Sequence, residues 1–129
     1  MELRVTLEGG KRVATQIGSH LIMTDQPATH GGGDSAPAPY DLFMASIATC
    51  AGFYALQFVT RRGLPAEGLA LSLEPLRQEG SKRVDTVRLT VDLPSDFPEK
   101  YRKPLERAID QCTVKRHILE PPAFDVVLR

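Results

Sequence analysis

The chain has 129 residues, of which 42% are hydrophobic and 25% charged, so it suits one globular domain and is too apolar for a disordered chain. Sixteen basic residues balance sixteen acidic ones and Trp is absent, so nothing here predicts a nucleic-acid or anionic-membrane partner. The first residues, MELRVTLEGG, lack the pattern of a signal peptide. We therefore expect a cytoplasmic protein whose two cysteines are thiols at rest.

The first 25 residues predict a β-meander. Apolar and polar residues alternate over 1–8, which is typical of a half-buried strand, and a Gly-Gly pair then marks a hairpin turn. Further strands are expected over 13–17 and 20–24, separated by a Gly-Ser turn. Three short strands connected by tight turns should form one antiparallel sheet.

A loop is expected next. The segment DQPATHGGGDSAPAP, from Asp25 to Pro39, contains three glycines and three prolines, which predict an absence of regular structure. Two interpretations stay open. The loop is either a flexible connector or, because long loops inside compact domains often carry function, part of a site.

The most apolar stretch, PYDLFMASIATCAGFYALQF over 39–58, predicts a long helix that begins with its proline and ends at the Arg-Arg-Gly sequence of 61–63. Eighteen residues over 42–59 carry no charge, so length alone would permit a membrane span. The interspersed Ser, Thr, Gly and Gln residues instead favour a helix buried on all sides of a soluble domain. A chain this small has difficulty covering such a helix, which suggests a second subunit.

Two antiparallel strands are expected over 69–73 and 87–93, where Leu and Val alternate with other residues, and RQEGSKR supplies the turn between them. Asp96 and Glu99 have the spacing of a capping box and should open a helical region. Pro104 lacks a backbone donor, so it should kink or restart that helix.

Four side chains after this proline lie on one helical face: Leu105, Ala108, Ile109 and Cys112. The chain should break near the cysteine and begin a short last helix. Alternating apolar residues then predict a closing strand: Phe124, Val126 and Leu128. The expected order, βββ–α–ββ–α–β over residues 1–129, describes a single α+β domain without internal repeats.

Two cysteines, Cys50 and Cys112, are the candidates for chemistry. No CxxC motif is present, and His20, His30 and His117 have no metal-ligand spacing, so a zinc site is disfavoured. Cys50 lies mid-helix, where no helix terminus favours its thiolate, so for this residue alone packing is favoured over reactivity. If the two thiols meet in space, however, they suit a peroxide-reducing pair, in which one thiol forms a sulfenic acid and the other condenses with it.

Two motifs carry a family resemblance. SAPAPYDLFMASIATCAGFYAL resembles the central-helix signature of the OsmC/Ohr family, and AIDQCTVKRHIL resembles its second signature, which usually reads Cys-Pro-Val before a short helix. The resemblance covers essentially the whole chain. The short N-terminal meander and the sequence up to the first cysteine make the chain more similar to the OsmC-like branch than to Ohr proper.

The resemblance implies an intertwined homodimer in which two long helices cross and the sheets wrap them. It also implies thiol-dependent reduction of organic hydroperoxides without a metal or flavin cofactor. By position, Cys50 matches the peroxidatic cysteine of the family and Cys112 its resolving cysteine.

This sequence departs from the family pattern in three places. The loop before the helix has no arginine to hold the thiolate, and His30 stands roughly where one is expected. Asp41 occupies the position of the usual glutamate, with a role at the helix end or at the site. Thr113 replaces the usual proline, which should alter the helix start and leave the thiol chemistry intact.

The function we predict from the sequence is reduction of an organic hydroperoxide through a Cys50 sulfenic acid and a Cys50–Cys112 disulfide. Asp41 and His30 are further candidate site residues. The expected partners are the hydroperoxide, a dithiol reductant such as one of lipoyl type, and a second copy of the chain, with no nucleic acid or membrane. The alternative is a non-catalytic protein of the same fold that binds a small apolar or acyl ligand at the dimer interface.

Overall fold

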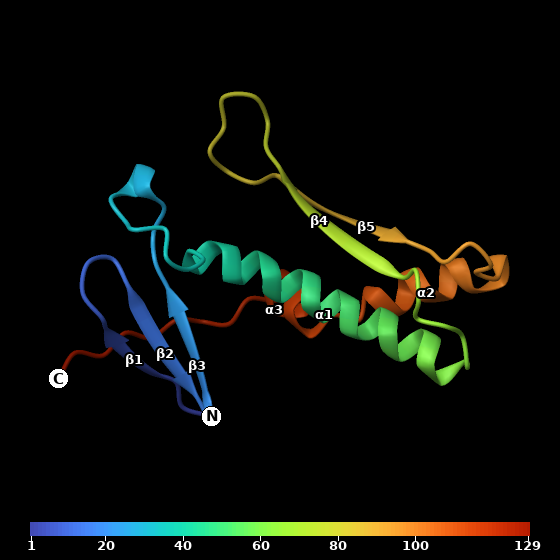
Figure 1. Cartoon of the computed structure of the whole chain (residues 1–129), viewed down its shortest axis with the longest axis horizontal. Helices are drawn as coiled ribbons and strands as arrows, with labels where there is room; N and C mark the ends of the chain where they lie inside the picture. The colour runs from blue at the N-terminus through green and yellow to red at the C-terminus, as the bar shows by residue number, and fades with distance from the viewer. The chain divides into compact units, whose positions relative to one another are not determined.

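The structure is a computed structural model that describes all residues, 1–129. Contacts within the chain divide it into two compact units, Met1–Ala45 and Ser46–Arg129, here called the N-terminal and C-terminal units. Two antiparallel sheets and three α-helices make up the chain, which confirms the expected α+β class (Figure 1). That the whole chain acts as a single domain stays a prediction.

The N-terminal unit contains a three-stranded meander. Strands β1 (Arg4–Leu7), β2 (Val13–Ile17) and β3 (His20–Thr24) pair antiparallel in chain order, as the sequence predicts. The expected half-burial of the first strand is wrong, because every residue of β1 is exposed. Within this unit β1 is an edge strand that pairs with β2 alone, and no apolar layer covers its side chains.

The loop between β3 and the long helix is organised by Asp25, a buried residue. Its carboxylate accepts hydrogen bonds from the hydroxyl of Ser35 at 2.6 Å, the N–H of Ser35 at 3.0 Å and the N–H of Gln26 at 2.7 Å. These bonds, led by that of the Ser35 hydroxyl, lower the pKa of Asp25 from 3.8 to about 2. The loop is therefore held by specific hydrogen bonds around one ionised carboxylate.

The same loop corrects one expectation. It contains a short 3₁₀ turn, η1 (Ala28–His30), where the sequence predicts no regular structure. Gly32 follows this turn, and a Cβ placed there would lie 1.9 Å from the carbonyl oxygen of Gln26. Only glycine permits this close approach of the two backbone segments.

The long helix α1 (Pro39–Arg61) has the predicted ends. Pro39 is its first residue, where a missing N–H leaves no hydrogen bond unmade. At the other end Gly63 has a left-handed φ of 65° and donates to the carbonyl of Thr60, while Leu64 donates to that of Val59. This pair of bonds is a Schellman cap, which explains why the helix stops at a glycine.

One side of α1 forms the core of the C-terminal unit. Ala51, Ala55 and Val59 are fully buried, and Leu105 and Ile109 from a later helix pack against them. One chain covers only one side of the helix, so the expected burial on all sides, with a second subunit, stays a prediction. Side chains on its other side remain open, including Phe53 at 55% and Leu56 at 49% exposure.

By length and composition α1 is the one helix that could cross a membrane, with a mean hydropathy of 1.6 over its most apolar window. The core helix of a soluble protein passes the same test, and 28% of this window is buried, on the side that packs in the core. The absence of a membrane partner stays a prediction.

A two-stranded sheet follows in the C-terminal unit. Strands β4 (Ala70–Leu76) and β5 (Thr86–Asp92) pair antiparallel, with Leu73 opposite Leu89. Leucine and valine side chains of both strands pack against the buried side of α1. Alternation in the sequence therefore predicts this hairpin correctly.

Three short helical segments come next: η2 (Glu99–Tyr101), α2 (Arg102–Ile109) and α3 (Thr113–Leu119). Pro104 lies in the first turn of α2, which confirms the expected restart of the helix there. The predicted capping box is wrong, since the helical region begins with η2 after Pro98 and no side chain caps it.

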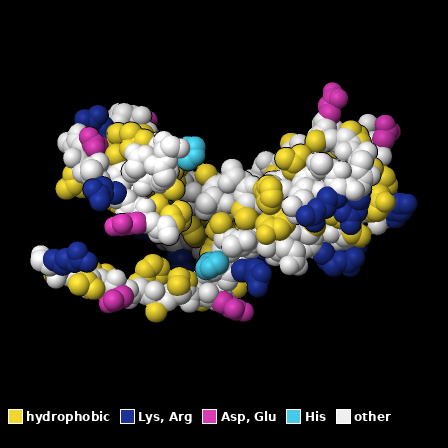
Figure 2. All heavy atoms as spheres, turned by 90° about the horizontal axis from the view of Figure 1, so that it is seen from below, with side chains coloured by type: hydrophobic (Ala, Val, Ile, Leu, Met, Phe, Trp, Pro, Cys, Tyr) yellow, Lys and Arg dark blue, Asp and Glu magenta, His cyan; other side chains and the backbone are white.

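The expected closing strand is also wrong. Residues 121–129 have no regular structure, and their apolar side chains lie on the surface, with Phe124 at 90% and Leu128 at 92% exposure. A strand needs a neighbour that completes its backbone hydrogen bonds, and neither sheet of this chain pairs with the segment. Figure 2 shows that hydrophobic side chains are widely exposed on the face it presents.

Candidate functional site

The structure brings the two cysteines together. Cys50 lies near the middle of α1 and Cys112 directly before α3, and both belong to the C-terminal unit. Their side chains are hydrogen-bonded to each other, and both are free thiols. Cys112 is buried, whereas Cys50 is partly accessible. A peroxide could therefore reach Cys50 more readily than its neighbour.

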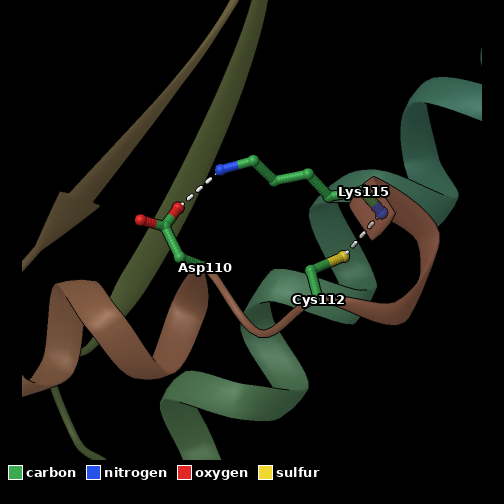
Figure 3. Close-up of polar contacts among 3 residues, drawn as sticks. All are labelled: Asp110, Cys112 and Lys115. Atoms are coloured by element: carbon green, nitrogen blue, oxygen red, sulfur yellow. Dashed lines mark hydrogen bonds and ion pairs between the residues drawn. The ribbon is translucent and has the colours of Figure 1, made fainter. Parts of the chain in front are cut away.

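Cys112 is fixed by the start of α3. It is the N-cap residue of that helix, and its Sγ atom accepts a hydrogen bond of 3.4 Å from the backbone N–H of Lys115 (Figure 3). The Lys115 side chain reaches back to Asp110, with a distance of 2.6 Å between its Nζ and the Oδ1 atom. The thiol thus takes the place of the side-chain oxygen of Ser, Thr, Asp or Asn that usually accepts this bond at a helix N-cap.

The first residues of α3 also act on Cys50. Burial raises the pKa of Cys50, but hydrogen bonds from the Val114 N–H, the Cys112 thiol and the Thr113 N–H outweigh it, so the net pKa is lowered. A cysteine in mid-helix therefore does receive backbone donors, supplied by a different helix. The expectation that Thr113 leaves the chemistry intact needs a correction, because a proline there could not supply its N–H.

Cys112 titrates in the opposite direction. Burial raises the pKa of its thiol, the N–H of Lys115 offsets part of this, and the hydrogen bond and charge of Cys50 raise the pKa further. When the pair loses its first proton, the charge therefore resides on Cys50, and Cys112 stays a thiol that donates to it. The arrangement contains one nucleophile and one proton donor in contact.

We expect Cys50 to react with iodoacetamide faster than Cys112, and to retain this reactivity as the pH is lowered past the range of an ordinary thiol. A lowered pKa means that the thiolate persists at lower pH, and the thiolate is the reacting form. Peptide mass spectrometry after timed labelling at several pH values measures both rates.

Thr113→Pro removes one donor to Cys50 and should shift its labelling profile to higher pH, while Thr113→Ala keeps the N–H and should not. Preferential labelling of Cys112 in the native wild-type protein would contradict the assignment.

The comparison with known families agrees with this pair. The model of the family described as OsmC-like protein matches residues 31–127, which is most of the chain and includes both cysteines. The chain belongs to the OsmC-like protein family. A comparison with curated proteins found no match.

Solved structures share the OsmC-like fold. A Psychrobacter arcticus 273-4 protein, described as a candidate osmotic stress induced and detoxification response protein, is 21% identical with a TM-score of 0.74, over 88% of this chain and 85% of that chain. An OsmC-like protein of unknown function from Vibrio cholerae is 12% identical with a TM-score of 0.67, over 89% and 90%. An organic hydroperoxide resistance protein from Legionella pneumophila is 17% identical with a TM-score of 0.56, over 92% and 89%. At these identities the likeness concerns the fold.

The other two predicted site residues of the OsmC-like chain lie in its N-terminal unit. The carboxylate of Asp41 accepts a hydrogen bond of 3.0 Å from the N–H of Ala38, so it caps the start of α1. His30 is exposed at the end of η1, with its Nδ1 atom 3.2 Å from the hydroxyl of Thr29. A role for either residue in the thiol chemistry stays a prediction.

Sequence reasoning missed the donors to Cys50. They are the backbone groups of Thr113 and Val114, which no side-chain pattern marks, although their place directly after Cys112 offers a signal in retrospect. The hydroxyl of Tyr54 lies 3.3 Å from that of Thr113 and connects α1 to α3. No group of three His, Cys, Asp or Glu side chains in the chain could hold a metal ion.

Proposed function

We propose that this OsmC-like protein reduces organic hydroperoxides with Cys50 as the attacking thiol and Cys112 as the resolving thiol. The observation that carries the proposal is the contact between two thiols whose pKa values are shifted in opposite directions. Such a separation of acid and nucleophile is what a peroxide-cleaving pair needs. The Legionella relative, described as an organic hydroperoxide resistance protein, supports the same chemistry.

In the first step the Cys50 thiolate attacks the terminal oxygen of R–OOH. The O–O bond breaks, an S–O bond forms, and the departing alkoxide takes a proton to leave as R–OH. The Cys112 thiol is the nearest proton donor, because it already donates a hydrogen bond to the Cys50 sulfur. The products are a Cys50 sulfenic acid, an alcohol and a Cys112 thiolate.

In the second step the Cys112 thiolate attacks the sulfur of the sulfenic acid. The S–S bond forms and hydroxide leaves, which takes up a proton from solvent as water. A dithiol reductant of small-molecule, protein or lipoyl type then supplies two electrons by thiol–disulfide exchange and restores both thiols. The peroxide is reduced by two electrons in each cycle, and the dithiol is oxidised by the same number.

An apolar surface beside Cys50 favours an organic substrate over hydrogen peroxide. Phe53 is about half exposed one turn after Cys50 on α1, and its ring lies 5.5 Å from that of Tyr54 in an edge-on arrangement. An alkyl or aryl group on the peroxide would remove part of this surface from water.

The test is peroxide consumption by the reduced wild-type protein with an excess of dithiothreitol, comparing cumene hydroperoxide with hydrogen peroxide at equal concentration. We expect the organic peroxide to be consumed faster. As a control, iodoacetamide should label both cysteines after unfolding, which shows that the protein used was reduced. If such reduced protein consumes neither peroxide, the alternative of a ligand-binding protein is favoured.

We also propose that the active form is a homodimer that covers the open side of α1. Large apolar side chains such as Phe53 and Leu56 are about half exposed on this helix in one chain, and burying them in a second copy is favourable. Light scattering should therefore give twice the 14.2 kDa mass of one chain.

Leu56→Glu should shift the protein towards monomers, because a charge would enter the apolar contact. Thr90→Glu, at an exposed position of β5 on the opposite sheet face from Leu89 and Val91, serves as the control and should remain dimeric. A compact wild-type monomer at micromolar concentration would contradict the dimer.

A further inference from the structure

Four arginines converge on a groove between the helices of the C-terminal unit. The groove has a volume of about 480 Å³, and its lining includes Arg61 and Arg62 from the end of α1, Arg107 from α2 and Arg116 from α3. No Asp or Glu lines it, although the chain as a whole has equal numbers of acidic and basic residues. The groove is therefore a local concentration of positive charge in an electrically neutral chain.

Nearby carboxylates do not neutralise this charge. Glu106 pairs with Lys103 and Asp110 pairs with Lys115, and the remaining ion pair of the chain joins Arg102 to Glu99. The four groove arginines form no ion pair. Figure 2 shows Lys and Arg side chains gathered around the last residues of α1 and around α2.

Helix dipoles explain why each arginine lies near the end of its helix, but they do not explain why the arginines meet at one groove. Arg61, Arg107 and Arg116 each lie in the last turn of a helix, where a cation interacts favourably with the helix dipole. Nothing in that effect requires three helices to aim these turns at one groove. Guanidinium groups that share a groove without carboxylate partners repel one another, and a bound anion would reduce that repulsion.

One guanidinium is also held in place before any ligand arrives. Arg62 lies over the ring of Phe58, 3.5 Å from its centroid, and donates a hydrogen bond to the Phe58 carbonyl at 3.3 Å. Stacking occupies the face of a guanidinium and leaves N–H groups at its edge free to bind an anion. Such prior ordering lowers the entropic cost of binding.

We propose that this groove is a binding site for a phosphate-bearing anion with more than one negative charge. Phosphate groups carry between one and two charges at neutral pH and match the planar, two-pronged donor pattern of arginine. A monocarboxylate would leave most of the positive charge unpaired. Neither cysteine lines the groove, which shares only Tyr54 with the surface beside Cys50, so binding there does not depend on the proposed peroxide reduction.

The test is calorimetric titration of the reduced full-length protein with pyrophosphate, with acetate at matched ionic strength as the comparison. Saturable binding of pyrophosphate alone is expected. The double variant Arg107→Gln, Arg116→Gln should weaken it by at least about tenfold, because it removes two charge-assisted contacts. Arg83→Gln removes a charge from the β4–β5 loop outside the groove and should leave the affinity within about twofold of wild type.

Two sources of the phosphate can be separated. Co-sedimentation with phosphatidic acid vesicles that pyrophosphate reverses would support the site with a lipid headgroup as its ligand, whereas pyrophosphate binding without vesicle binding would assign it to a free phosphate compound. Absence of saturable pyrophosphate binding, equal binding of acetate, or an equal loss in Arg83→Gln would overturn the proposal.

Discussion

Cys50→Ser should abolish the reduction of organic hydroperoxide, and Cys112→Ser should stop it after one turnover. In the first variant the nucleophile is replaced by a hydroxyl that does not ionise near neutral pH. In the second, Cys50 still attacks but no thiol resolves its sulfenic acid. Dimedone trapping followed by peptide mass spectrometry should then find the adduct on Cys50 in Cys112→Ser after one equivalent of cumene hydroperoxide.

Neither substitution should change the stability of the fold by much. Ser at position 112 remains a good N-cap for α3 because its oxygen can accept the hydrogen bond that the thiol accepts from Lys115. Circular dichroism melts of both variants should therefore stay close to wild type. Unchanged steady-state peroxide consumption in Cys50→Ser, or dimedone labelling only elsewhere in a folded Cys112→Ser protein, would exclude the two-thiol mechanism.

Ala51→Glu should prevent the C-terminal unit from folding. Ala51 is completely buried beside Ala55, and the side chains around it are apolar, including Leu105 of α2. A carboxylate placed there has no partner, and an unpaired buried charge costs several kcal/mol, a large part of the stability of a domain this size. The measurement is the soluble fraction on expression together with the cooperativity of thermal unfolding.

Thr60→Glu introduces the same side chain at an exposed position of α1 and is the control for charge and helix propensity. It should unfold cooperatively, with only a small loss from the unfavourable charge near the helix C-terminus. A soluble Ala51→Glu protein that unfolds like wild type would show that this side of α1 is not the core.

Local signals in the sequence predict the local structure well. The proline and glycine at the two ends of α1 act through their own backbone preferences, and the alternation in β2 to β5 follows from the geometry of a strand. These features require only neighbouring residues, so the pattern contains enough information to locate them.

The expected closing strand is absent for a different physical reason. The alternation at Phe124 and Leu128 shows that the segment could form a strand, but pairing depends on a sheet edge that meets it, and neither sheet of this chain pairs with the segment. The open side of α1 likewise depends on what packs against it. At the site, resemblance predicted the cysteine pair, while the N–H donors of Thr113 and Val114 have no side-chain signature.

The carboxylate of Asp25 makes the stability of the folded chain depend on pH. Its pKa in the folded chain, about 2, lies below its ordinary value of 3.8, so the unfolded chain takes up a proton at a higher pH than the folded chain does. Its contribution to stability is complete above the ordinary value and is lost as the pH falls through the folded one. Near neutral pH neither state binds that proton, so titrating the thiols there leaves the charge that orders the Asp25–Pro39 loop unchanged.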